Sequence, residues 1–484
     1  MNIAENKRKM GKVALLRLKP PVFEYSYHPI GFRPPYILKY IEAFLKKEDF
    51  CDVKLIDQRI TRLSFEDIVK NIKTWAPDIV VISISTLDVE QSLRFCRILR
   101  EGTIGKSILI FGVGQEISAD IEKYKDFNPL FDILLGGEAE IEIASIIRKI
   151  NDGIDIKELK NFYNQDIFKT KLMEVSDPDS LPFPIYAPGS LEAYNFVYPL
   201  KLNKKVVWGH MLSSRGCPHH CIFCSQIMRE SYGNRFRGRS ATNVVDEMEH
   251  LSDFGANVIT FDDDNFTSSR DHVKAICDEI ESRQLKIKWI AHARIDEVDF
   301  ALLKLMKKAG CLLLRFGIET GSKRVLEILS KTRNSGLWLK RVRHVIGRTR
   351  SVGIATVGLF IVGSPTETKD DLLESINFAK IISPDVIQVA YFIPFPGSSA
   401  YSLFKDQLKG IPFSKMYHYD KPLINLSAMS NGELEKAQSI FYASFLLRPI
   451  FVVKHIFNYL FFYLYNPTVF LELLGITRLI LRGK

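Results

Sequence analysis

Short apolar runs alternate with helical stretches between residue 12 and about residue 150, and this alternation constrains the fold more than any other feature. The apolar runs are VALLRL, CDVKLID, DIVVISIS, ILIFGVG and FDILLGG. Strands that are separated by helices need crossover connections, which give a parallel sheet covered by helices on both faces. The sequence therefore predicts a doubly wound α/β domain with ligands bound at the carboxyl ends of its five strands.

The loops at these predicted carboxyl ends are rich in small residues. Such residues let a bulky planar or phosphate-bearing ligand approach the backbone. The candidate binding residues are Ser85 and Leu87 after the third strand, Gly112 and Gly114 at the fourth, and Gly136 after the fifth. Ordinary tight turns between a strand and a helix have the same composition, so the loops alone do not identify a ligand.

Strands and helices alternate again in the second half of the chain, as they do in a β/α barrel, where catalytic groups lie at the carboxyl ends of the strands. The preceding segment DPDSLPFPIYAPGSLEAY is rich in proline and has no sustained periodicity, so it is typical of an extended linker. We expect an amino-terminal domain over 10–152, a linker over 153–205, a partial TIM-like barrel over 206–415 and a small helical region over 416–484. The predicted fold class is α/β.

The loop SSRGCPHHCIFCSQ carries Cys217, Cys221 and Cys224 in a C-x3-C-x2-C spacing. Three thiolates so close in sequence can converge on one metal centre, and Arg215 is expected to raise the positive potential that favours thiolates. Iron–sulfur clusters are ligated by cysteine, normally one per iron, so three cysteines on a four-iron cluster leave one iron open. A zinc site completed by a histidine of the loop, or cysteines that only fill the core, are the alternatives.

This loop resembles the cluster-binding loop of radical S-adenosylmethionine (SAM) enzymes, in which three cysteines hold a 4Fe-4S cluster. Phe223 stands where that family usually has an aromatic residue. The resemblance implies that Cys217, Cys221 and Cys224 are the cluster ligands and that the open iron binds the amino and carboxylate groups of SAM. An electron from the cluster would then cleave SAM to a 5′-deoxyadenosyl radical.

Further motifs of the same family follow in order along the predicted barrel strands. Asp263 and Asp264 end the strand that meets the amino group of SAM in the family, and a solvated acidic turn is the alternative. Arg294 is a candidate partner for the carboxylate of SAM, or for a neighbouring aspartate. Glu319 lies in a GIET step that the resemblance places near the ribose or amino group. Gly363 is expected to let the backbone approach adenine.

The amino-terminal domain resembles the cobalamin-binding domain fused to the front of many radical SAM enzymes. The chain has no D-x-H-x-x-G motif, so no histidine ligand for cobalt is evident. The resemblance implies three cofactors: a 4Fe-4S cluster, SAM and cobalamin. We therefore expect a radical SAM C-methyltransferase that methylates an unactivated carbon of a hydrophobic or lipid-like substrate. Radical cyclisation or oxidation without cobalamin, and a non-enzymatic zinc-binding protein at the membrane, are the alternatives.

The last segment, 441–484, is apolar and aromatic and carries five Lys or Arg against one Glu. Lys454 and Pro467 interrupt its apolar stretches, which fall short of the roughly 20 residues that span a bilayer. Apolar helices bordered by basic residues can lie in the membrane interface. A helical cap packed on the barrel is the alternative.

Composition restricts the compartment and the partners. Seven cysteines without a disulfide pattern indicate a reducing compartment, and we expect a cytoplasmic protein with peripheral contact at the inner face of the membrane. The net charge is +10, but no block of basic residues is interleaved with aromatic ones, so no nucleic acid is expected. The expected partners are a small-molecule or lipid-like substrate and an electron donor such as flavodoxin or ferredoxin.

Overall fold

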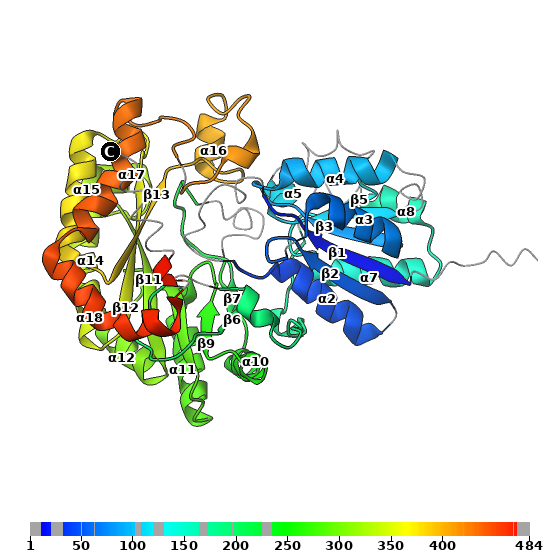
Figure 1. The fold of residues 1–484 in the computed structure, drawn as a ribbon, viewed down its shortest axis with the longest axis horizontal. Coiled ribbons are helices and arrows are strands. Elements are labelled where there is room, and N and C mark those ends of the chain that lie inside the picture. The colour runs from blue at the N-terminus through cyan, green and yellow to red at the C-terminus, as the bar shows by residue number, and fades with distance from the viewer. Residues whose placement is uncertain are drawn as a thin grey trace, which may run out of the picture.

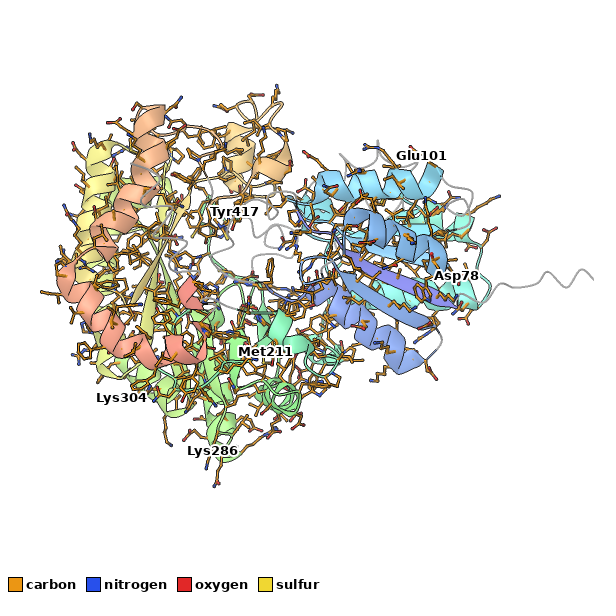
Figure 2. The ribbon with its side chains drawn as sticks, viewed as in Figure 1. Asp78, Glu101, Met211, Lys286, Lys304 and Tyr417 are labelled. Carbon is orange, nitrogen blue, oxygen red and sulfur yellow. The ribbon has the colours of Figure 1, made fainter. Side chains whose placement is uncertain are left out.

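The computed structural model places two parallel sheets side by side, each with its own helices (Figure 1). The amino-terminal sheet lies in the blue and cyan part of the ribbon, and the larger sheet lies in the green to orange part. Met211 is fully buried inside the larger part, whereas Lys286 and Lys304 point outward at its edge (Figure 2). The structure describes residues 11–20, 32–49, 51–61, 63–101, 108–119, 130–163, 173–195, 198–224, 235–419, 421–467 and 469–471.

The amino-terminal sheet has five parallel strands in the order β2-β1-β3-β4-β5. Its strands are β1 (Lys12–Arg17), β2 (Asp52–Asp57), β3 (Ile79–Ser83), β4 (Leu109–Val113) and β5 (Ile133–Leu134). Its helices are α2 (Tyr36–Glu48), α3 (Phe65–Trp75), α4 (Val89–Glu101), α5 (Gln115–Ala119) and α7 (Glu140–Asn151). This order confirms the predicted doubly wound fold.

Strand β1 shows why these apolar runs form buried strands. Val13 and Leu15 pack with α2 and α7 on one face of the sheet. Ala14 and Leu16 pack with α3 and α4 on the other face. Because both faces are covered, a central strand needs an unbroken apolar run, which is the pattern that the sequence has.

The larger sheet has six parallel strands in the order β13-β12-β11-β10-β9-β6, and among the described residues its two edge strands do not pair with each other. It is therefore a partial barrel, as predicted. Its strands are β6 (Trp208–Met211), β9 (Val258–Phe261), β10 (Lys288–Ala293), β11 (Cys311–Glu319), β12 (Ala355–Val362) and β13 (Val386–Tyr391). Its helices are α10 (Ala241–Asp253), α11 (Arg270–Ser282), α12 (Phe300–Lys308), α13 (Lys323–Ile328), α14 (Ser335–Ser351), α15 (Lys369–Ile382) and α16 (Ser399–Phe404), with 3-10 turns at Phe266–Ser268 and Phe413–Lys415.

The segment between the two sheets is more ordered than the predicted extended linker. It contains α8 (Ile156–Asn161) and two 3-10 turns, Pro178–Ser180 and Ser190–Ala193. Tyr186 and Tyr194 belong to the core of the barrel. The surrounding proline-rich segment has no sustained periodicity, so the sequence pattern did not reveal that they are buried.

The chain ends in α17 (Asn431–Leu446) and α18 (Pro449–Tyr465). In the part of the chain that the structure describes, neither helix alone has the length and composition to cross a membrane, although the two pass that test as a pair bent by 74°. Arg478, Arg482 and Lys484, which contribute to the predicted basic tail, lie outside the described residues.

Candidate functional site

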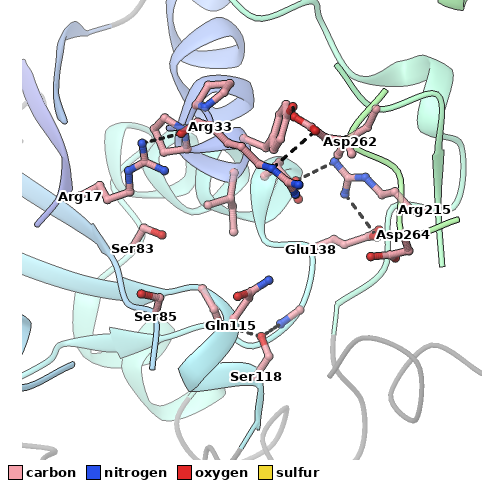
Figure 3. Close-up of a pocket in the computed structure, with 18 of the residues that line it drawn as sticks. Arg17, Arg33, Ser83, Ser85, Gln115, Ser118, Glu138, Arg215, Asp262 and Asp264 are labelled. Carbon is pink, nitrogen blue, oxygen red and sulfur yellow. Dashed lines mark hydrogen bonds and ion pairs between the residues drawn. The ribbon is translucent and has the colours of Figure 1, made fainter. Parts of the chain in front are cut away.

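A cavity of about 400 Å³ lies where the carboxyl ends of the two sheets face each other (Figure 3). Arg17 and Ser83 line it from the ends of β1 and β3 in the amino-terminal domain. Leu212 and Asp262 line it from the ends of β6 and β9 in the barrel. The cavity therefore occupies the position where doubly wound sheets bind ligands, with the barrel as its second wall.

Ser85 and Gly114 lie in the wall of this cavity, as the sequence analysis expected of binding residues. The Ser85 hydroxyl donates to Asp88 at 2.6 Å, and Arg59 donates to both residues at 3.1 and 2.7 Å. Gly114 has a φ of +113°, and a Cβ added there would lie 2.6 Å from the carbonyl oxygen of Ile84. Only glycine fits at this close approach of two chain segments.

The close approach at Gly114 leads to a stability prediction. We expect Gly114→Ala to lower the free energy of unfolding of the amino-terminal domain by about 3 kcal/mol, because it adds a steric clash to an unfavourable φ. The control is Gly189→Ala, at a φ of +77° where no atom lies within 4 Å of an added Cβ. The free energy of unfolding of that variant should fall by only about 1 kcal/mol. Urea unfolding followed by circular dichroism measures both, and equal losses would contradict the prediction.

The other three predicted ligand contacts of this domain do not line the cavity. Gly112 lies inside β4, where an added Cβ would come within 2.6 Å of the Leu134 side chain, so the glycine serves packing. Leu87 packs against a buried cluster in the region of α16. The Gly136 carbonyl accepts a backbone hydrogen bond from the segment between the sheets. The sequence pattern predicted the sheet edge at which the cavity lies but not which loop residues line the cavity.

A second cavity, of about 160 Å³, lies beside the first at the carboxyl ends of β9, β10 and β11. It gathers most of the residues that the barrel motifs had singled out. Those that line it are Cys217, Cys221, Phe223, Cys224, Asp264, Arg294 and Glu319. Asp264 lines both cavities, and the adjacent residues Gly216 and Cys217 line the first and the second.

Two cations border the thiols of the second cavity. Arg294 Nη1 lies 3.8 Å from the sulfur of Cys221, while Arg294 Nη2 donates to the carbonyl of Lys331 at 2.6 Å. Arg294 Nε lies 2.7 Å from Asp296, the neighbouring aspartate that was the alternative partner of this residue. Lys331 Nζ donates to Glu319 at 2.8 Å. Burial raises the pKa of the Cys217 thiol to about 11, so a bound metal is what would hold this sulfur as a thiolate.

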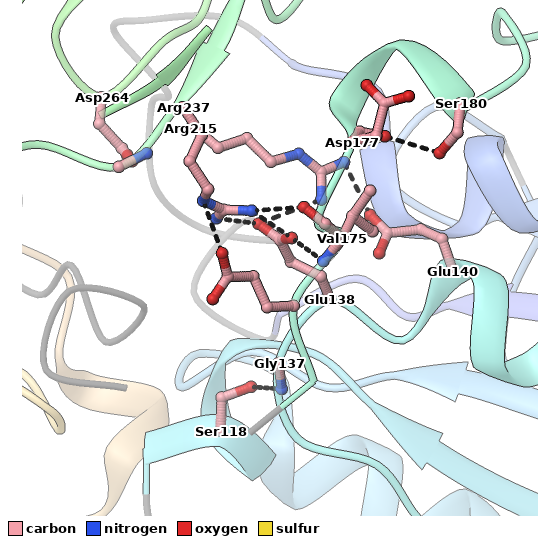
Figure 4. A network of polar contacts seen from close by, with 12 residues as sticks. Ser118, Gly137, Glu138, Glu140, Val175, Asp177, Ser180, Arg215, Arg237 and Asp264 are labelled. Carbon is pink, nitrogen blue, oxygen red and sulfur yellow. Dashed lines mark hydrogen bonds and ion pairs between the residues drawn. The ribbon is translucent and has the colours of Figure 1, made fainter. Parts of the chain in front are cut away.

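Arg215 does not support the thiolates, and that prediction is wrong. Its guanidinium turns toward the amino-terminal domain, where Nη1 lies 3.3 Å from Glu138 and Nη2 lies 2.9 Å from Glu140 (Figure 4). The two carboxylates compensate its charge. Arg294 and Lys331 are the cations at the cysteines instead.

Glu138 is the centre of this contact between the domains. Its carboxylate accepts hydrogen bonds from Arg237 at 2.9 and 2.6 Å and from the Val175 amide at 2.7 Å, besides the ion pair with Arg215. Burial opposes ionisation, but Arg237 and Arg215 hold the pKa of Glu138 below its usual value. Both arginines belong to the two-stranded sheet of β7 (Ser214–Arg215) and β8 (Arg237–Gly238), which carries the cysteine loop. The loop after β5 is thus tied to that loop.

The two predicted aspartates have different positions. Asp263 accepts from the amide and hydroxyl of Ser213 and from the hydroxyl of Ser214, at 2.5 to 2.7 Å. It is 1% exposed and lines neither cavity, so its predicted contact with SAM is not supported. Asp264 accepts from the Gly216 amide at 3.1 Å and faces both cavities. The two neighbouring carboxylates thus have different partners, Asp263 the serines after β6 and Asp264 the start of the cysteine loop.

Asp262, for which the sequence suggested no role, lies in the wall of the larger cavity. It accepts from the Tyr36 hydroxyl at 2.6 Å, and His210 Nδ1 lies 2.8 Å away. Burial opposes ionisation, but Arg33 and His210 hold the pKa of Asp262 well below its usual range. The run of three aspartates was the only signal, because Tyr36 and Arg33 lie more than 200 residues away in sequence.

Gly363 lies against α17 rather than at a cavity. An added Cβ would come within 2.7 Å of Leu434, and φ is +77°, so the glycine lets the helix approach the strand end. Its amide donates to Glu367 at 2.6 Å, and burial raises the pKa of that carboxyl to about 8. The predicted contact of Gly363 with adenine is not supported by this position.

The donor set of the second cavity suits an iron–sulfur cluster. Its three cysteines line one small space, and a cluster takes thiolates on separate irons. Among the described residues, no three His, Cys, Asp or Glu side chains converge as a single metal ion requires. His219, a candidate zinc ligand, has its Nε2 2.6 Å from Glu297.

Comparison with known families agrees with this arrangement. A family described as the B12 binding domain matches residues 22–147, and the Radical SAM superfamily matches residues 211–379. The chain belongs to the radical SAM enzymes that carry a B12-binding domain. These two matches confirm the predicted cofactors of this radical SAM enzyme: a 4Fe-4S cluster, SAM and cobalamin.

The sequence similarity to several relatives covers most of this radical SAM enzyme. An uncharacterized methyltransferase of Pyrococcus horikoshii is 28% identical over 93% of this chain and 96% of its own length. The anaerobic magnesium-protoporphyrin IX monomethyl ester cyclase of Cereibacter sphaeroides is 26% identical over 84% of this chain and 65% of its own. The structure of the radical SAM methyltransferase TsrM from Kitasatospora setae, solved with cobalamin and a [4Fe-4S] cluster, superposes with a TM-score of 0.62 at 18% identity, covering 83% of this chain and 75% of that one. The last similarity concerns the fold.

Proposed function

We propose that this enzyme transfers a methyl group to an unactivated carbon of a small molecule. The observation that carries the proposal is the shared wall of the two cavities: Asp264 lines both, and Gly216 and Cys217 line one each. When bound, the cluster and SAM supply a radical that removes a hydrogen atom from carbon, and cobalamin supplies the methyl group. Two cofactors on either side of one residue would act on the same substrate carbon.

The side chains of the smaller cavity would bind and orient SAM. Cys217, Cys221 and Cys224 would hold the cluster. Arg294 is the proposed partner of the SAM carboxylate, because a guanidinium matches a carboxylate in charge and geometry. Asp264 and Glu319 are the acceptors that could meet its ammonium group or its ribose hydroxyls, and Phe223 adds an apolar wall.

The larger cavity would take cobalamin at the carboxyl ends of β1, β3 and β4. Ser85 and Gly114 lie there, with Gln115 and Ser118 as further polar neighbours. Arg59 holds the Ser85 hydroxyl in place through its bond of 3.1 Å. These groups would orient the ligand by hydrogen bonds, while Gly114 permits the close approach of the backbone.

The predicted hydrophobic or lipid-like substrate rested on the apolar carboxyl-terminal tail. In the structure, α18 packs beside Trp208 and Val258 at the amino ends of β6 and β9, whereas both cavities lie at the carboxyl ends. The part of the tail that the structure describes therefore does not line the proposed site. We propose a small-molecule substrate that enters between the two sheets. The flavodoxin or ferredoxin donor and the cytoplasmic location stay predictions.

A test of the function starts with anaerobic reconstitution in the presence of cobalamin. We expect four irons per chain, visible absorption from a bound corrinoid and 5′-deoxyadenosine on incubation with SAM and a reductant. SAM with a deuterated methyl group, supplied with fractionated cell extract, should label the product. Formation of 5′-deoxyadenosine without corrinoid or label would favour cyclisation or oxidation, which the magnesium-protoporphyrin cyclase relatives support. Zinc without iron would support the non-enzymatic alternative.

A further inference from the structure

Helix α18 is anchored to the amino end of the barrel by one face. Phe462 of α18, and Val469 beyond the end of the helix, lie in a buried cluster with Trp208 and Val258, which begin β6 and β9. The Asn466 side chain accepts from the Val206 amide at 3.0 Å and donates to the Lys204 carbonyl at 3.1 Å. The helix therefore has a fixed orientation on the protein.

The opposite face of α18 is a stripe of exposed apolar side chains, which we call the outer face. Ile450 is 85% exposed, Phe457 81% and Leu464 66%, and Val453 and Phe461 lie between them at 55% and 56%. These positions recur every three or four residues, so they form one side of the helix. Proteins that stay in water rarely expose so large a continuous apolar surface, which marks a docking site.

The charge around the outer face selects its partner. Arg448 and Lys454 are the only charged residues that the structure describes between 447 and 471, and both are basic. Arg448 donates to the carbonyl groups of Phe445 and Lys380, so Lys454 is the exposed cation beside the outer face. The rest of the sequence to the carboxyl terminus adds three basic residues against one acidic residue. Basic groups next to an apolar helix complement anionic lipid headgroups, whereas a second copy of the chain would bring the same positive charge to the contact.

We propose that the outer face of α18 docks on an anionic lipid bilayer, with the helix in the plane of the interface. Seventeen helical residues extend about 25 Å, which suits a helix that lies on the membrane rather than one that crosses it. The cavities lie at the other end of the barrel strands, and no residue of α18 lines them. The inference is therefore independent of the proposed methyl transfer.

Vesicle flotation with the full-length protein tests the proposal. We expect wild type to float with vesicles that contain phosphatidylglycerol, to float poorly with phosphatidylcholine alone and to be released by salt. The double variant Ile450→Ser/Phe457→Ser should bind at least about tenfold less. The matched control is Leu337→Ser/Leu403→Ser, at side chains 55% and 66% exposed on α14 and α16. It should bind as wild type does.

Three outcomes would overturn the proposal. One is the absence of flotation with any vesicle, and another is equal flotation of the two double variants. The third is a wild-type dimer that Ile450→Ser/Phe457→Ser converts to a monomer, which would assign the outer face to self-association. Iron content and far-ultraviolet circular dichroism of each variant establish that it is folded, so a failure of docking is distinguishable from a failure to fold.

Discussion

Replacement of Cys221 by alanine is expected to lower the rate of SAM cleavage by more than about a thousandfold, because a cluster ligand is lost. Cys221 lines the smaller cavity with the other two cysteines of its loop, and Arg294 lies 3.8 Å from its sulfur. We expect the reconstituted variant to bind clearly fewer than four irons and to lack the spin-resonance signal of a reduced cluster. The assay is 5′-deoxyadenosine formed from SAM under reductant.

Cys51→Ala is the control for this experiment. Cys51 is a free, half-buried cysteine in the amino-terminal domain, and it lines neither cavity. The control should keep the iron content, the spectrum and the rate of wild type within about twofold. A Cys221→Ala protein that still bound four irons and cleaved SAM would remove the cysteine loop from the cluster site.

Replacement of Glu138 by glutamine is expected to separate SAM cleavage from methyl transfer. Glutamine keeps the shape of the side chain but removes the negative charge that pairs with Arg237 and Arg215. Breaking such a buried ion pair should lower the free energy of unfolding by about 3 kcal/mol. Because the cysteine loop would then be held less firmly against the amino-terminal domain, methyl transfer should fall about a hundredfold. The cleavage of SAM depends only on the barrel side and should change by less than about threefold.

Two measurements check the Glu138→Gln prediction. The ratio of 5′-deoxyadenosine to methylated product should rise, and limited proteolysis between the domains should become faster. The control is Glu192→Gln, which breaks an ion pair with Lys205 whose side chains are 55% and 63% exposed. If both variants kept the wild-type ratio, the contact at Glu138 would have no part in coupling SAM cleavage to methyl transfer.

The contact at Glu138 should also weaken in acid. The folded protein lowers the pKa of this carboxyl, so its ion pairs stabilise the fold at neutral pH. That contribution is present above the pKa of the unfolded chain and is lost as the pH falls through the lowered folded pKa. Interdomain proteolysis as a function of pH should therefore show a rise on the acid side that Glu138→Gln lacks.

The sequence predicted the fold well because its strands are covered on both faces. The run VALL contains no polar residue, and β1 buries Val13 through Leu16 against helices on alternate sides. The cysteine spacing was equally local, so the loop could be recognised without any knowledge of the fold. Features whose parts lie close together in sequence were predictable for this reason.

Contacts between distant segments were not predictable. Nothing in the sequence around Glu138 indicates that it meets Arg237, 99 residues away. Nor does any local pattern indicate that Tyr36 meets Asp262 across 226 residues. The direction of single side chains was also hidden. Asp263 and Asp264 are indistinguishable in the sequence, although only Asp264 faces the cavities. The turn at Gly363 has the composition of a ligand-binding turn, but Leu434 packs against it.

The segment between the sheets has a consequence for how such proteins can be divided. Tyr186, Leu191 and Tyr194 complete the barrel core, and the Tyr194 hydroxyl donates to Asp57 at 3.1 Å. A barrel fragment that began at residue 206 would lack these side chains and leave apolar surface open to water. An amino-terminal domain that is to be exchanged should therefore end before the proline-rich segment. A barrel that is fused to another amino-terminal domain has to include that segment.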